Sequence, residues 1–108
     1  TVAGDSVGIR IQESTNVRIS YVDVQNSDRG IDAIDAKCLN LDNCVFFNNN
    51  QGLIYANVQG GSINACQFVN NHAGDSQAIM TLRESSDVTV QDTFVINNSC
   101  ADSAAVVY

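Results

Sequence analysis

The chain has 108 residues and a net charge of −7, from 12 acidic and 5 basic side chains. This length fits one domain, and the few scattered basic residues exclude a surface that follows a phosphate backbone, so no nucleic-acid partner is expected. Since no apolar stretch approaches the roughly 18 residues needed to cross a bilayer, no transmembrane segment is expected either.

Short predicted strands return along the chain at a fixed interval. The first reads Gly8-Ile9-Arg10-Ile11, and its counterparts begin at Gly30 and Gly52, with a fourth at Ile79 to Leu82. Successive strand side chains point to opposite faces. One face should therefore carry the apolar residues Ile9, Ile31, Leu53 and Met80.

A polar corner and a second strand follow each first strand. The corner occurs twice in nearly the same form, at Glu13 to Ile19 and at Glu84 to Val90. The second strand ends in Asn pairs such as Asn48-Asn49 and Asn70-Asn71. Asn tolerates the left-handed conformation that a one-residue corner requires. Each row is thus a strand, a corner, a strand and an Asn turn.

The 22-residue period of these rows is typical of a solenoid. A row this short is too small for a strand–helix repeat, and it predicts an all-β, right-handed, single-stranded parallel β-helix of about four to five coils of roughly 22 residues. We expect residues 1–108 to form a single domain and a segment of a longer solenoid. The alternative is an antiparallel sandwich, which needs hairpin turns, and the chain has no Asn-Gly or Asp-Gly dipeptide.

The period also predicts which residues stack. Two internal stacks are expected, and a structural ladder of Asn side chains should bond along the axis at the turns. The first stack is Ile19, Leu41, Ile63 and Val90, the second is Val24, Phe46, Phe68 and Val95, and the ladder is Asn26, Asn48, Asn70 and Asn97.

Two irregular features leave alternatives open. The link from His72 to Ala78 is longer than its counterpart in the preceding row, and such an insertion is either a polar spacer or a displayed binding loop. Cys44 and Cys66 occupy the same position of neighbouring rows, so they are either buried free thiols or a disulfide. The Cys residues have no zinc spacing, and no metal or cofactor is expected. Asn97 begins a glycosylation sequon.

The chain resembles the right-handed parallel β-helix, or pectin-lyase-like, superfamily. The resemblance is carried by the Gly-Ile pairs at Gly8 and Gly30, the Asn-Val-x-Ile step at Asn16, and the Cys-x-Phe-x-Asn-Asn steps at Cys44 and Cys66. Three Phe-x-x-Asn steps, at 46–49, 68–71 and 94–97, are similar to repeats of chlamydial polymorphic outer-membrane proteins. That resemblance implies a surface-exposed adhesin, although the companion Gly-Gly-Ala-Ile motif is absent.

Many β-helix proteins act on polysaccharides, so the resemblance also allows a catalytic site. The Asp-Asp, Gly-His-Gly and Arg-x-Lys motifs of pectic hydrolases are absent. Glycoside hydrolysis needs two carboxyl groups about 5 to 10 Å apart, and the acidic candidates are Glu13, Asp32 and Asp35. Arg83 is the candidate for the basic residue that a lyase needs. Asp32 should stack beside Arg10, which also fits a surface ion pair.

The sequence therefore predicts a non-catalytic structural or adhesive segment that is extracellular or on the cell surface. Its expected partners are copies of itself or neighbouring coils stacked end to end, and a polysaccharide or host surface. An acidic, Asn-rich chain with four cysteines suits that setting. The alternative function is a polysaccharide lyase, hydrolase or epimerase, or its carbohydrate-binding part.

Overall fold

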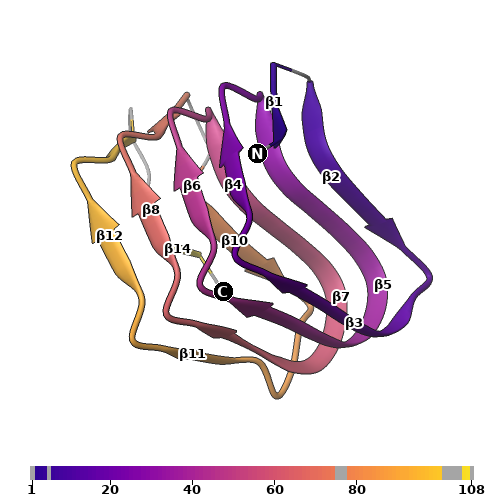
Figure 1. The fold of residues 1–108 in the computed structure, drawn as a ribbon. Helices are drawn as coiled ribbons and strands as arrows, with labels where there is room; N and C mark the ends of the chain where they lie inside the picture. Colours follow the sequence, from indigo (N-terminus) through magenta and orange to yellow (C-terminus); the bar gives the residue numbers. More distant parts are fainter. Residues whose placement is uncertain (1, 5, 75–77, 101–105, 108) are drawn as a thin grey trace.

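Every regular element of the described residues is a β-strand (Figure 1). The computed structural model describes residues 2–4, 6–74, 78–100 and 106–107. The strands are β1 (Val2–Ala3), β2 (Val7–Gln12), β3 (Thr15–Ser20), β4 (Asp23–Gln25), β5 (Arg29–Asp42), β6 (Val45–Phe47), β7 (Gln51–Asn64), β8 (Gln67–Val69), β9 (His72–Ala73), β10 (Met80–Arg83), β11 (Thr89–Gln91), β12 (Phe94–Ile96), β13 (Ser99–Cys100) and β14 (Val106–Val107).

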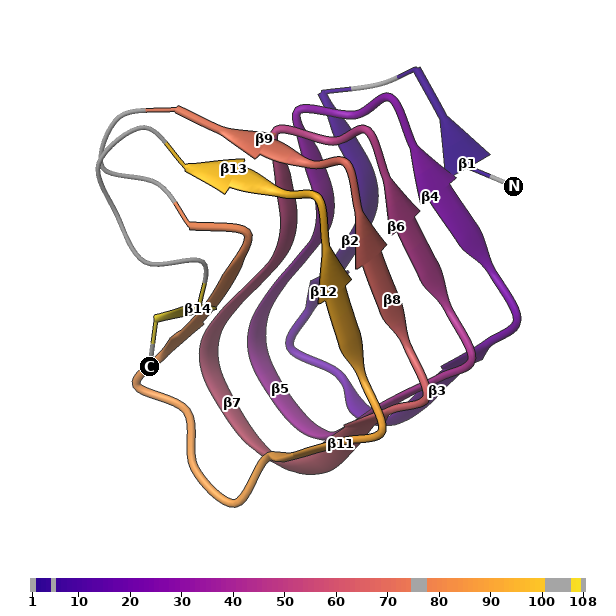
Figure 2. The same cartoon turned by 90° about the vertical axis from the view of Figure 1, so that its left-hand side faces the viewer.

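All pairings between these strands are parallel, and each joins one coil to the next (Figure 2). A five-stranded sheet has the order β1-β4-β6-β8-β12. A second sheet has the order β14-β10-β7-β5-β2, with β3 beside β5 and β11 beside β7, and β13 pairs with β9. The predicted parallel solenoid is confirmed, and the antiparallel alternative is wrong.

The register follows the sequence period. Ile9 lies opposite Ile31, and Ile31 lies opposite Leu53, so these coils are 22 residues long. Leu53 lies opposite Met80, an offset of 27. The five additional residues fall in the predicted insertion. Its first two residues, His72 and Ala73, form β9, whereas residues 75–77 lie outside the described part of the chain.

Left-handed residues form the corners of the coils, and they recur in four columns at the same spacing. The columns are Glu13, Asp35, Asn57 and Glu84; Asn16, Cys38, Gly60 and Asp87; Tyr21, Asn43, Ala65 and Asp92; and Gly4, Asn26, Asn48, Asn70 and Asn97. Asn, Asp and Gly adopt this conformation at low cost, which explains their abundance here. The corners bend the long strands β5 and β7, so that β2 and β3 both pair with β5.

The interior is filled by the predicted stacks. Phe46 and Phe68 are fully buried, and their rings lie parallel with centroids 4.5 Å apart. Gly30 makes room for them, because a Cβ there would lie 3.2 Å from a Phe46 ring carbon and 2.4 Å from the Gly52 carbonyl oxygen. The Gly-Ile pairs at the start of the coils are therefore a packing requirement.

The last coil departs from the predicted core. Leu41, Ile63 and Val24 are fully buried, and Ile19 is partly buried against the core. Val90 and Val95 have the predicted register but are 36% and 41% exposed, so their assignment to the core was wrong. Both lie in strands, β11 and β12, that have a neighbouring strand on one side only among the described residues.

The third Phe-x-x-Asn step is also out of register. Val95, not Phe94, lies opposite Phe68, and the Phe94 side chain is 59% exposed. Phe94 therefore faces outward, although its spacing to Asn97 matches the spacing in the two steps before it.

The buried Asn ladder lies one residue after the predicted column. The Asn71 side-chain oxygen accepts the Asn49 backbone N–H at 2.9 Å, and the Asn71 side-chain nitrogen donates to the Phe46 carbonyl at 2.9 Å. Asn49 makes the same two bonds to the coil before it, and Asn98 makes them to the coil that contains Asn71. The ladder therefore satisfies backbone groups that would otherwise be buried without partners.

The predicted column, Asn26, Asn48, Asn70 and Asn97, instead forms exposed left-handed corners. Asn48 still donates to the Asn26 side-chain oxygen at 2.6 Å, on the solvent side. The prediction of bonding along the axis holds for that pair, and the buried ladder is a second column of Asn residues that was not predicted.

Tyr55 has a fully buried hydroxyl group without a hydrogen-bond partner. An unpaired buried polar group costs about 1–3 kcal/mol. We expect Tyr55→Phe to raise the free energy of unfolding by about that amount, measured by urea denaturation at pH 7. A loss of stability in this variant would mean that the hydroxyl has a favourable partner.

Burial raises the pKa of Tyr55 well above its ordinary value of 10.0, with smaller contributions from Cys66 and Cys44. An acid whose pKa is raised by folding keeps its proton in the native state, whereas the unfolded chain loses it above the ordinary pKa. Stability should therefore be constant up to about pH 9 and fall as the pH rises through 10. Urea titrations between pH 8 and 11 should show a shallower fall for Tyr55→Phe than for the wild type.

Candidate functional site

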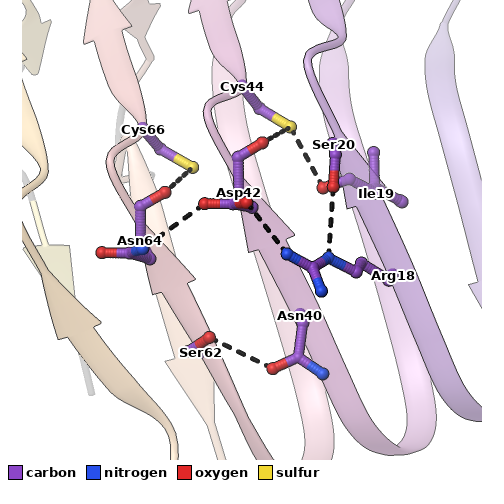
Figure 3. Close-up of polar contacts among 9 residues, drawn as sticks. All are labelled: Arg18, Ile19, Ser20, Asn40, Asp42, Cys44, Ser62, Asn64 and Cys66. Carbon is purple, nitrogen blue, oxygen red and sulfur yellow. Dashed lines mark hydrogen bonds and ion pairs between the residues drawn. The ribbon is translucent and has the colours of Figure 1, made fainter.

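A polar groove lies on the outer face of the sheet formed by β3, β5 and β7 (Figure 3). Its volume is about 280 Å³, and it is lined by Arg18, Asn40, Asp42, Ser62 and Asn64. None of these residues was predicted as a site residue from the sequence.

Strand alternation places these side chains in two rows along the solenoid axis. One row runs through Arg18, Asn40 and Ser62, and the other passes through Asp42 and Asn64. Between them runs the apolar row of Leu41 and Ile63, which points inward. The groove is therefore the outward counterpart of the predicted internal stack, and its rows repeat at the spacing of neighbouring strands, about 4.8 Å.

Hydrogen bonds across the strands hold the groove side chains in place (Figure 3). The Ser62 hydroxyl donates to the Asn40 side-chain oxygen at 3.1 Å. Asn64 donates to one oxygen of Asp42 at 3.3 Å, and Arg18 donates to the other at 3.1 Å. Arg18 also donates to the Ser20 hydroxyl at 3.3 Å.

These contacts contribute more to geometry than to stability. The Arg18 side chain is 70% exposed, and an ion pair of this kind contributes at most about 1 kcal/mol. The side chains nevertheless stand on strands whose backbones are fixed by pairing, so they are ordered before any ligand arrives. Amide, hydroxyl, carboxylate and guanidinium groups together offer both donors and acceptors to a polar ligand.

The sequence-based catalytic candidates do not line this groove. Glu13 and Asp35 occupy the same corner column in neighbouring coils, as the 22-residue offset predicts. Arg83 lies opposite Ala56, one position before that column. It is three coils beyond Gln12, which precedes Glu13.

Asp32 and Asp35 each have a local partner. Asp32 lies opposite Arg10 in the register, as expected, but its ion pair is with Arg29 at 3.0 Å. The Asp35 carboxylate accepts a hydrogen bond from the Asn57 side chain at 2.8 Å. The structure therefore gives these two acids contacts within the corners and strands, and none of the four candidates lines the polar groove.

Cys38, Cys44 and Cys66 are free thiols in the structure. Cys44 and Cys66 are fully buried at one template position, and Cys44 donates to the carbonyl oxygens of Ile19 and Asp42 at 3.5 and 3.6 Å. Thr93, in the same position of a later coil, donates its hydroxyl to Ile63 and Gln91 in the same way. The neighbouring Cys44 thiol and burial raise the pKa of Cys66. These thiols are structural donors.

His72 lies on β9, and its ring nitrogen hydrogen-bonds the Ser99 hydroxyl on β13. This pair is exposed and joins neighbouring coils. In the described ranges, no group of three or more His, Cys, Asp or Glu side chains is placed to hold a metal ion. No helix of the described residues is long and apolar enough to cross a membrane.

The family model for the right-handed β-helix region matches residues 1–108. The chain belongs to the right-handed β-helix family. No curated protein and no solved structure matches it significantly. The family assignment agrees with the parallel pairing of the coils. It assigns no role to the groove.

Proposed function

We propose that this right-handed β-helix chain is a non-catalytic, extracellular adhesive segment that binds an extended polysaccharide along its polar groove. The observation that carries the proposal is the pair of ordered polar rows on β3, β5 and β7. A polymer laid along the solenoid axis meets polar side chains in both rows at each of these coils. The spacing of about 4.8 Å between strands is close to the length of one sugar ring.

The charge of the chain favours a neutral polysaccharide. The net charge of −7 repels acidic polymers at low ionic strength. Within the groove, Arg18 and Asp42 neutralise each other, and the remaining lining residues, Asn40, Ser62 and Asn64, are uncharged. Neutral sugar hydroxyls match such amide and hydroxyl groups because both sides donate and accept.

Binding to insoluble polysaccharides tests the proposal. The chain should sediment with a neutral polysaccharide such as cellulose or a β-glucan, and the double variant Asn40→Ala/Asn64→Ala should remain in the supernatant. Asn50→Ala is the matched control, because Asn50 donates to Asp28 in the same way outside the groove. Equal retention of wild type and double variant would show that the groove is not the binding surface.

A catalytic role is the second candidate, and one observation favours it. Glu13 and Asp35 stand at equivalent corners of neighbouring coils, a spacing comparable with the separation of the carboxyl groups in retaining glycosidases, about 5 to 5.5 Å. Incubation with pectate or alginate in the presence of calcium tests it. Product formation that is lost in Asp35→Asn would establish this function over an adhesive one.

A further inference from the structure

A second outer face, on strands β6, β8 and β12, is mainly apolar, whereas the groove face is polar. Val24, Phe46, Phe68 and Val95 occupy one register row of this sheet. Alternation therefore turns the residues on either side of that row outward. On β6, β8 and β12 these are Val45, Phe47, Gln67, Val69, Phe94 and Ile96, which we call the outer apolar face.

The outer apolar face exposes large side chains. Phe47 is 38% exposed, Phe94 is 59% exposed and Ile96 is 45% exposed. Val45 and Val69 between them are partly exposed. Phe94 is the most exposed of these three side chains. The register places Val95 inward and so turns the Phe94 ring to solvent. Contiguous apolar patches on a protein surface mark interaction sites.

The distribution of charge identifies the partner. The chain has no Asp, Glu, Lys or Arg from Asn43 to Gly74, and β12 adds none. The acidic side chains lie before and after this uncharged band, so two copies repel each other over most of their surfaces. The outer apolar face lies in the uncharged part of the chain, with Asp23 beside Val45 at its edge, so repulsion is weak where this face of one copy meets the same face of the other.

We propose that the outer apolar face is the interface of a homodimer in which two solenoids pack side by side. The contact is isologous, with the same patch on both copies. Two sheets packed face to face lie about 10 Å apart, with outward side chains interdigitating between them. The groove on β3, β5 and β7 belongs to a different sheet and remains accessible, so the dimer presents two grooves.

Sedimentation velocity of the 108-residue chain over a range of concentrations tests this proposal. The wild type should move from 11.6 kDa towards twice that mass as the concentration rises. Phe47→Ser/Phe94→Ser should remain at 11.6 kDa at concentrations where the wild type is dimeric. Tyr21→Asn removes an aromatic that is 79% exposed at a corner outside this sheet, and it should dimerise like the wild type.

A second variant keeps the test decisive if the double variant folds poorly. Gln67→Glu adds a charge to the outer apolar face without removing apolar contacts. It should weaken dimerisation by about tenfold or more, because each copy brings the new charge to the interface. Gln59→Glu on β7 is the matched control and should have no comparable effect. A wild type that stays monomeric, or an oligomer that none of these variants weakens, would overturn the proposal; the second result would show association through another surface.

Discussion

Phe68→Ala should lower the free energy of unfolding by about 3–5 kcal/mol, the usual cost of deleting a buried aromatic ring. The ring is fully buried and stacks on Phe46 with an angle of 10° between the planes. The cavity also removes the atoms that pack against Gly52, where a Cβ would lie 2.7 Å from the Phe68 ring. Urea denaturation followed by circular dichroism measures the loss.

Phe94→Ala is the control for this prediction, since the two residues are one register position apart and Phe94 faces solvent. In dilute, monomeric protein its effect should be about 0.5 kcal/mol or less. Similar losses for Phe68→Ala and Phe94→Ala would contradict the register of β8 and β12.

Asn71→Ala should destabilise the solenoid by about 2–6 kcal/mol, because it leaves two buried backbone groups without partners at about 1–3 kcal/mol each. These groups are the Asn49 N–H and the Phe46 carbonyl. The expected loss is thus comparable with that of a core aromatic, although the side chain is polar. Thermal and urea unfolding measure it.

Asn70→Gly is the matched control for the ladder. Asn70 is exposed at a left-handed corner, with a φ of 54°, a conformation that Gly adopts readily. Its replacement should change the free energy of unfolding by less than about 1 kcal/mol. If Asn70→Gly cost more than Asn71→Ala, the originally predicted column would be the structural ladder after all.

The fold could be predicted because the period appears in many residues at once. Rows such as Ile9, Ile31 and Leu53 fix a parallel register, since a slip of one residue would turn every apolar side chain outward. The 27-residue offset could be predicted too, because the corner from Glu13 to Ile19 returns at Glu84 to Val90. Along these coils, the residues that form the corners and the residues that pair between strands recur with the same period.

The inner ladder could not be located by the period alone. Asn48 and Asn49 repeat with the same spacing, and the left-handed corner at Asn48 interrupts strand alternation between them. The one signal in the sequence is the first row, where Ser27 replaces the second Asn; Ser27 is buried, whereas Asn26 is exposed. A small polar residue at that position fits an interior site better than a solvent-exposed corner.

The groove was missed because its residues look like an ordinary solvated strand face. Asn40, Ser62 and Asn64 can be recognised as groove residues only from the register, which places them beside one another and beside Asp42. The catalytic candidates show the opposite case, in which residues that stand out in the sequence make only local contacts in the structure. Asp32 and Asp35 were selected for their acidity, yet the structure pairs one with Arg29 and the other with Asn57.

The central claim is that the groove binds a neutral sugar chain along the solenoid axis, and titration calorimetry with oligosaccharides of increasing length tests it most directly. The groove spans three neighbouring strands, β3, β5 and β7. Affinity should therefore rise from one sugar to three and then level off, and Asn40→Ala/Asn64→Ala should abolish the rise. An affinity that does not depend on length, or that is unchanged in the double variant, would contradict the claim.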